Sequence, residues 1–337
     1  LDTLGARLMD FLFDMFLGTP VWFWLSFIGI VVVLTAFDLG FLHKEDKEMG
    51  IAESLKLSAF YISIALAFGL WVWYAKGADL GMKYYTGFFI EKALSIDNVF
   101  VISLIFTYFA IPAKYQYRAL LWGIIAVIVL RGIMIAAGAA LVEQFYWTLY
   151  LFAVFLVGTG VKMLFTGDQE MDVSRNPVVK FMNKHFRVTK ELHGQKFIVK
   201  VEDEKTGKMV RAMTPLLLAL IVINLADLVF AVDSVPAIFA ITTDTFIVYT
   251  SNIMAILGLR ALYFALAAMV HRFHYLKFAL ALVLIFIGSK IFISDLLMGG
   301  AKFPPVLSLA VTFGLILGGI LYSLWKTKGE ETSASAH

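Results

Sequence analysis

Nine long apolar stretches, separated by short polar breaks, run along this chain of 337 residues. A helix needs about 20 consecutive apolar residues to cross a hydrocarbon core about 30 Å thick. With 61% hydrophobic and 16% charged residues, the chain has more apolar surface than a water-soluble core of this length can bury. The pattern predicts an all-α, polytopic membrane protein and excludes a soluble enzyme, a nucleic-acid-binding module and a disordered scaffold. The predicted spans are residues 20–42, 54–75, 88–110, 118–140, 145–165, 214–241, 247–270, 276–297 and 304–325.

Lysine and arginine are unevenly divided between the two sides of the membrane that these spans define. If the N-terminus is outside, 18 of them lie in or next to the inner segments and 4 lie in the outer segments. Cytoplasmic loops of membrane proteins are enriched in basic residues. We therefore expect a multi-pass protein with its N-terminus outside, its C-terminus in the cytoplasm and its apolar faces in contact with the lipid bilayer.

Residues 166–213 form the one long polar segment between the predicted spans. Apolar residues alternate with Lys180, Lys184 and Arg187 over 177–188, which predicts an amphipathic helix at the cytoplasmic membrane surface. The residues that follow predict a short β-hairpin. The segment is interpreted first as an ordered connector on an anionic membrane surface and second as a regulatory sensor. It is also the predicted binding surface for a protein partner.

An acidic motif occurs twice in the chain, and its two copies are 136 residues apart. Each copy has an acid, then an aspartate six residues later, then a small amide or hydroxyl residue. Each copy also begins a unit of three spans, so the two units would cross the membrane in opposite directions. Such inverted repeats are common in secondary transporters, with the binding site near the middle of the membrane. The first copy is Glu91, Asp97 and Asn98, and the second is Asp227, Asp233 and Ser234.

The spans and the repeat together divide the chain into six parts. The fold expected from them is an inverted-topology repeat of two three-helix units, with flanking helices and a small cytoplasmic loop. The parts are residues 1–87 with the N-terminal segment and the first two spans, 88–165 with the first unit, 166–213 with the loop, 214–297 with the second unit, 298–326 with the last span, and 327–337 as a disordered tail.

Ten charged side chains lie three or more residues inside the ends of the predicted spans. Each costs at least about 2.5–3.5 kcal/mol on insertion scales, so it normally faces a cavity or a partner. Buried ion pairs often add no stability over apolar packing. We therefore expect the repeated acids to be functional and the bases to compensate charge or act in gating. The acids are Asp38, Glu91, Asp97, Asp227 and Asp233, and the bases are Lys92, Arg131, Lys162, Arg260 and Lys290.

The repeated motif supplies only oxygen ligands, which suit hard cations such as Mg²⁺, Ca²⁺ and Mn²⁺. Histidine is absent from the middle of the spans and cysteine from the whole chain, which disfavours zinc and copper. Residues six apart on a regular helix do not face one point, so Glu91 and Asp97 should point in different directions. We expect Asp97 and Asp233 to share a site near mid-membrane, with Glu91 and Asp227 serving in gates or proton relay.

The chain around both motifs resembles the TerC family of integral membrane proteins. Residues 91–101, 230–242 and 250–260 carry the resemblance, which extends over roughly residues 20–325. It implies a bacterial inner-membrane protein of the lysine-exporter-like transporter superfamily, with a historical link to tellurite resistance and a link to Mn²⁺ efflux. Many family members have Glu where this chain has Asn224. The loss of this carboxylate would weaken the attraction for a cation or shift the proton stoichiometry. The metal-handling residues implied by the family motifs are Glu91, Asp97, Asn98, Asp227, Asp233 and Ser234.

Two functions from different classes fit these features. The first is a transporter that exports Mn²⁺ in exchange for protons, with the metal ion as its ligand and no organic cofactor. The second is a non-transporting membrane scaffold or tellurite-resistance factor that acts through the loop 166–213. An ion channel that uses the same acids is a third possibility. A membrane enzyme fits least, because the sequence has no nucleophile–base pair and no HExxH-like metal site. We expect no nucleic-acid partner, and the oligomeric state, the choice among Mn²⁺, Mg²⁺ and Ca²⁺, and the proton stoichiometry stay open.

Overall fold

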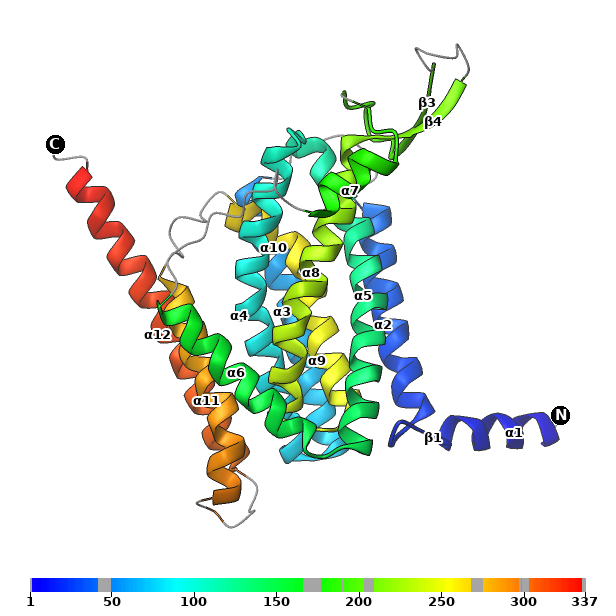
Figure 1. Cartoon of the computed structure of the whole chain (residues 1–337). Coiled ribbons are helices and arrows are strands. Elements are labelled where there is room, and N and C mark those ends of the chain that lie inside the picture. The colour runs from blue at the N-terminus through cyan, green and yellow to red at the C-terminus, as the bar shows by residue number, and fades with distance from the viewer. Residues whose placement is uncertain are drawn as a thin grey trace.

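Long helices make up most of the chain, and several of them lie side by side in one bundle (Figure 1). This computed structural model describes residues 2–41, 50–165, 177–189, 191–202, 209–267, 275–296, 298 and 303–334. The helices are α1 (Asp2–Phe13), α2 (Val21–Phe41), α3 (Ile51–Lys76), α4 (Ala78–Tyr108), α5 (Ala113–Gln144), α6 (Thr148–Phe165), α7 (Pro177–His185), α8 (Pro215–Phe239), α9 (Thr245–Leu257), α10 (Leu259–Ala267), α11 (Leu276–Leu296) and α12 (Pro305–Ala334). Two antiparallel hairpins join β1 (Met15–Phe16) to β2 (Thr19–Pro20) and β3 (Ile198–Glu202) to β4 (Met209–Met213).

Seven helices in the described part of the chain are long and apolar enough to cross a membrane, or eight if α9 and α10 form one bent span. The seven are α2, α3, α5, α6, α8, α11 and α12. Helix α4 falls outside this set because charged residues interrupt its apolar sequence. It is nevertheless 31 residues long and contacts α3, α8, α9 and α12. The prediction of an all-α polytopic membrane protein is confirmed, and every predicted span overlaps a helix or, for 247–270, the pair α9–α10.

The predicted span 247–270 is not one continuous helix. The axis bends by 44° between α9 and α10, at Gly258. A Cβ atom on Gly258 would lie 3.0 Å from Nζ of Lys92 and 3.1 Å from Cβ of Tyr61, so glycine allows α3 and α4 to approach the break. Lys92 donates from Nζ to the carbonyl oxygen of Ala255 at 3.1 Å. The ammonium group therefore stabilises the negative end of α9, where carbonyl groups lose their partners within the helix.

Helices α6 and α11 pack through glycines at reciprocal positions. A Cβ atom on Gly160 would lie 2.7 Å from the carbonyl oxygen of Ala281, and one on Gly288 would lie 2.7 Å from that of Ala153. Each alanine precedes the glycine of its own helix by seven residues. The two helices therefore run antiparallel with their backbones in close approach, as small residues allow in membranes.

Replacing Gly288 by Ala is expected to lower the free energy of unfolding by about 1–3 kcal/mol, the usual range for overpacking. The new Cβ would meet a backbone oxygen at 2.7 Å and Cγ2 of Val157 at 2.9 Å, and the backbone cannot rotate away. Thermal unfolding in detergent, followed by tryptophan fluorescence, measures the loss. Gly158→Ala on α6 is the matched control, since nothing lies within 4 Å of its Cβ. Equal stability of the two variants would contradict tight α6–α11 packing.

The segment 166–213 packs against one end of the bundle, the end that also holds the last turns of α12 (Figure 1). Val179 and Met182 of α7 are buried against the bundle, while Phe181 remains exposed. Arg118 of α5 donates to Oε1 of Gln195 at 3.0 Å and so ties the segment to the bundle. The apolar face of α7 is therefore directed largely at the protein. Residues 166–176, 190 and 203–208 of this segment lie outside the described part of the structure.

The end of the chain differs from the predicted disordered tail at 327–337. Helix α12 continues to Ala334, well beyond its apolar part, and only residues 335–337 lie outside the described range. The residues after Trp325 include several Lys and Glu, which are good helix formers, and they include no proline. At the other end of the bundle, α1 lies beside the N-terminal end of α2 (Figure 1).

Candidate functional site

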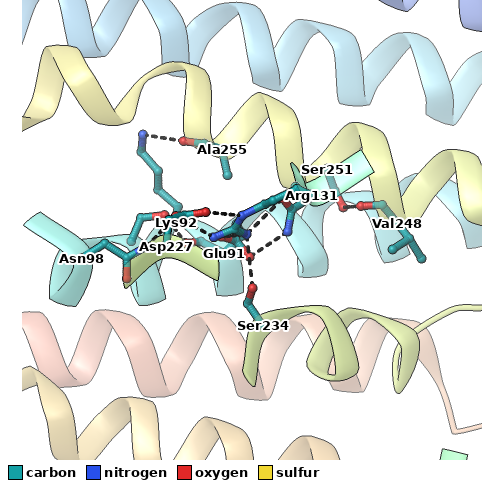
Figure 2. Close-up of polar contacts among 11 residues, drawn as sticks. Glu91, Lys92, Asn98, Arg131, Asp227, Ser234, Val248, Ser251 and Ala255 are labelled. Carbon is teal, nitrogen blue, oxygen red and sulfur yellow. Dashed lines mark hydrogen bonds and ion pairs between the residues drawn. The ribbon is translucent and has the colours of Figure 1, made fainter. Parts of the chain in front are cut away.

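Arg131 lies at the centre of a buried cluster of charged side chains from three helices (Figure 2). It belongs to α5, and its Nη1 atom forms an ion pair with Oε1 of Glu91 on α4. Its Nη2 and Nε atoms each donate to one oxygen of Asp227 on α8, both at 3.1 Å. Arg131 is 1% exposed, Glu91 0% and Asp227 9%. The guanidinium group therefore joins α4, α5 and α8 through carboxylates that are shielded from solvent.

Three neutral polar side chains complete the cluster. Ser234 Oγ and Asn252 Oδ1 both accept hydrogen bonds from Nη1 of the guanidinium, at 3.1 and 3.0 Å. Asn252 Nδ2 donates to Oε2 of Glu91 at 2.9 Å, and Asn98 Nδ2 donates to Oδ1 of Asp227 at 3.5 Å. All three neutral side chains are buried. The cluster therefore combines carboxylate, amide and hydroxyl oxygens, the ligand types that hard cations prefer.

Helical spacing explains why both copies of the acidic motif reach this point. Glu91 and Asn98 are seven residues apart, about two turns, so they share one face of α4. Asp227 and Ser234 have the same spacing on α8. Asn98 contacts Asp227, while Glu91 and Ser234 bind the same nitrogen of the guanidinium group. Helices α4 and α8 therefore run antiparallel past one another at the cluster.

The structure describes the side chains of two of the four repeated acids, Glu91 and Asp227. Sequence spacing was interpreted with Asp97 and Asp233 at the shared site and Glu91 and Asp227 away from it. Glu91 and Asp227, expected away from the shared site, meet at the cluster, where Glu91 shares a helical face with Asn98. The backbones of Asp97 and Asp233 belong to α4 and α8, and their side chains lie outside the described part of the structure.

The cluster carries an excess of negative charge. Among the described side chains, two carboxylates and one guanidinium give it a formal charge of −1. Lys92 follows Glu91 in the sequence, but its ammonium group points away from the cluster toward Ala255 (Figure 2). Within the described residues, no group of three or more His, Cys, Asp and Glu is placed to hold a metal ion. A buried carboxylate without its own counter-charge favours the uptake of a proton or a cation.

Arg260, the predicted counterpart of Arg131, lies in a separate ion pair. It projects from α10 and pairs with Asp38 of α2, a helix outside both repeat units. Arg260 is 2% exposed and Asp38 is 3% exposed. The guanidinium carbon lies 4.4 Å from the ring centre of Tyr117, whose hydroxyl donates to the backbone oxygen of Asp38 at 3.2 Å. Asp38 and Arg260 therefore compensate each other's charge and fasten α2 to the bundle.

The remaining predicted polar residues do not reach the cluster. Lys290 on α11 is buried, and its Nζ lies 3.4 Å from Oγ of Ser308 on α12. Lys162 on α6 is exposed, because α6 turns the face of Gly160 toward α11. Asn224 on α8 donates from Nδ2 to the backbone oxygen of its own helix, at Leu220.

Asn252 is the one cluster residue that the site prediction did not include. Its signal in the sequence is a polar triplet, 250–252, inside an otherwise apolar stretch. The triplet contributed to the family resemblance, but it carries no charge and has no counterpart in the other repeat unit. In the structure Asn252 holds the cluster together, since it binds both Arg131 and Glu91.

Comparisons with known proteins agree with the helical architecture. The family model described as "Integral membrane protein TerC family" matches residues 76–331. An uncharacterized membrane protein of Rickettsia felis is 48% identical over 301 residues, which cover 89% of this chain and 97% of that protein. Proteins provisionally named membrane-bound redox modulator Alx are 40% identical in Photorhabdus laumondii and 39% identical in Escherichia coli K12, over 94% and 91% of this chain and 98% and 95% of those proteins. No solved structure matches the chain.

Proposed function

Because this chain belongs to the TerC family of integral membrane proteins, we propose that it is a membrane transporter that exports a divalent cation, with Mn²⁺ as its substrate. The observation that carries the proposal is the meeting of Glu91 and Asp227 at one buried point with an unbalanced negative charge. If the cluster were only a structural ion pair, one carboxylate would be enough to neutralise Arg131. The second acid gives the cluster its capacity to bind a cation.

The ligand chemistry supports a hard divalent cation. The cation would take carboxylate oxygens from Glu91 and Asp227 and neutral oxygens from Ser234, Asn98 and Asn252. Mn²⁺, Mg²⁺ and Ca²⁺ all accept such a set, and the family resemblance favours Mn²⁺. Asp97 and Asp233 would take part in loading or release, since each adjoins a cluster residue in the sequence.

The packing supports an inverted repeat and hence alternating access. Reciprocal contacts relate α4 to α8 at the cluster and α6 to α11 at their glycines. Both pairs cross antiparallel, as two inverted copies of one three-helix unit would. Rocking of one unit against the other would expose the cluster to each side of the membrane in turn. Protonation of the carboxylates outside would release the metal ion and couple its export to inward proton flow.

The position of the basic segment supports the proposed orientation. Helix α7, the hairpin β3–β4 and the last turns of α12 lie at one end of the bundle, and α1 lies at the other (Figure 1). The segment 166–213 is rich in Lys and Arg, which are enriched in cytoplasmic loops. We therefore place the N-terminus outside and the C-terminus in the cytoplasm of a bacterial cell. Because the sequence has no cysteine, a redox effect like that named for the relatives would come from the exported metal ion and not from thiols of this chain.

Mn²⁺ flux into proteoliposomes that contain the purified chain tests the proposal. We expect flux above that of empty liposomes, driven by an opposed proton gradient, with Mg²⁺ and Ca²⁺ as weaker competitors. Asp97→Asn and Asp233→Asn should each abolish this flux while the protein remains folded. The alternative scaffold function predicts no Mn²⁺ flux for the wild type. It also predicts that cells lose tellurite resistance when the segment 177–202 is removed. Absence of flux with correctly folded protein would overturn the transporter proposal.

A further inference from the structure

We propose that Arg131 is an internal cation that competes with the transported ion for Glu91 and Asp227. This inference rests on the proposed function and assigns a selectivity role to a residue on α5, outside both copies of the acidic motif. The guanidinium group would occupy the site when no metal ion is bound, and binding of the metal ion would displace it.

The hydrogen bonds of the cluster carry the first step of the argument. Arg131 donates to both oxygens of Asp227, to one oxygen of Glu91, and to the oxygens of Ser234 and Asn252. These are the same oxygen atoms that a hard cation would use as ligands. A metal ion can therefore enter this ligand set only where the guanidinium group leaves it.

Charge provides the second step. Arginine remains protonated in proteins, so Arg131 cannot free the carboxylates by losing a proton. Without it, two carboxylates would face each other in a site that is almost closed to solvent, which is strongly unfavourable. Arg131 therefore stabilises the empty transporter. Displacement by a divalent ion exchanges one positive charge for two, whereas displacement by Na⁺ or K⁺ gains no charge. The exchange favours divalent over monovalent ions.

The test compares Mn²⁺ binding to the purified full-length chain and to Arg131→Gln, measured by equilibrium dialysis in detergent. We expect the variant to bind Mn²⁺ about tenfold more tightly, within the range of ~5–150-fold that is typical of coupled binding. It should also bind Na⁺ measurably, and its Mn²⁺ flux should fall because the empty transporter loses its internal counter-ion. A residue with a structural role alone would weaken binding when replaced. Unchanged or weaker Mn²⁺ binding by a folded Arg131→Gln variant would therefore overturn the inference.

A matched control and a second variant keep the test decisive. The double variant Asp38→Asn/Arg260→Gln removes the other buried ion pair without touching the cluster, and its Mn²⁺ affinity should equal that of the wild type. Arg131→Lys keeps the charge but cannot bind both carboxylates with a planar fork. It should show a smaller gain in Mn²⁺ affinity, and it decides the question if Arg131→Gln does not fold. If the wild type transports Mn²⁺ but neither Arg131→Gln nor Arg131→Lys binds Mn²⁺ more tightly, only this inference is contradicted. If the wild type shows no Mn²⁺ flux, the proposed function is contradicted.

Discussion

Glu91→Gln is expected to reduce Mn²⁺ flux at least about 100-fold, which corresponds to about 3 kcal/mol at ~1.4 kcal/mol per tenfold change. The substitution keeps the shape of the side chain and one acceptor oxygen, and its amide nitrogen can no longer accept the second hydrogen bond, from either Arg131 or Asn252. It removes one of the two carboxylates, so the formal charge of the cluster changes from −1 to zero. A neutral cluster, already satisfied by Arg131, has no net attraction for a cation.

The flux assay in proteoliposomes measures this effect at matched amounts of reconstituted protein. Glu143→Gln is the control, because it makes the same chemical change at an exposed residue near the end of α5, far from the cluster. Its flux should match that of the wild type. If Glu91→Gln transported Mn²⁺ as fast as Glu143→Gln, the carboxylate of Glu91 would not belong to the transport site.

Asp38→Asn is expected to lower the free energy of unfolding by about 3–5 kcal/mol, the usual loss when one partner of a buried ion pair is removed. Asp38 is the only acid paired with Arg260 in the described part of the chain, and both residues are almost fully buried. The substitution would leave the guanidinium charge of Arg260 without a counter-ion between α2 and α10. Unfolding in detergent, followed by tryptophan fluorescence, measures the loss.

Two further variants separate this effect from a general loss of polar contacts. Arg260→Gln in the Asp38→Asn background removes the stranded charge and should restore most of the lost stability. Asp79→Asn breaks the ion pair with Lys83, which lies partly at the surface, and should change stability by less than about 1 kcal/mol. A single Asp38→Asn variant as stable as Asp79→Asn would show that the buried pair is not what fastens α2 to the bundle.

Length and apolarity predict the helices of this chain well, because the membrane thickness requires about 20 apolar residues for each crossing. The bend at Gly258 could not be predicted from apolarity, since the residues that lie against it, Lys92 and Tyr61, approach from other helices. The continuation of α12 to Ala334 likewise depends on local helix-forming residues outside the apolar span.

The acids of the candidate site could be predicted from their repetition, but their arrangement could not. Spacing of six residues drew attention to Glu91 and Asp97, whereas the seven-residue spacing of Glu91 and Asn98 determines which face of α4 meets α8. The repeat also suggested equivalent roles for Arg131 and Arg260. The structure shows different partners for them, because Asp38 comes from α2, a helix that the repeat does not include. Sequence symmetry therefore locates candidate residues, and tertiary packing selects their partners.

The most direct measurement is the position of Mn²⁺ in crystals of the wild-type chain, located by its anomalous scattering. The account predicts a Mn²⁺ ion bound by the carboxylates of Glu91 and Asp227, with the guanidinium group of Arg131 withdrawn from both. A Mn²⁺ ion bound elsewhere, with Arg131 still paired to both acids, would contradict it.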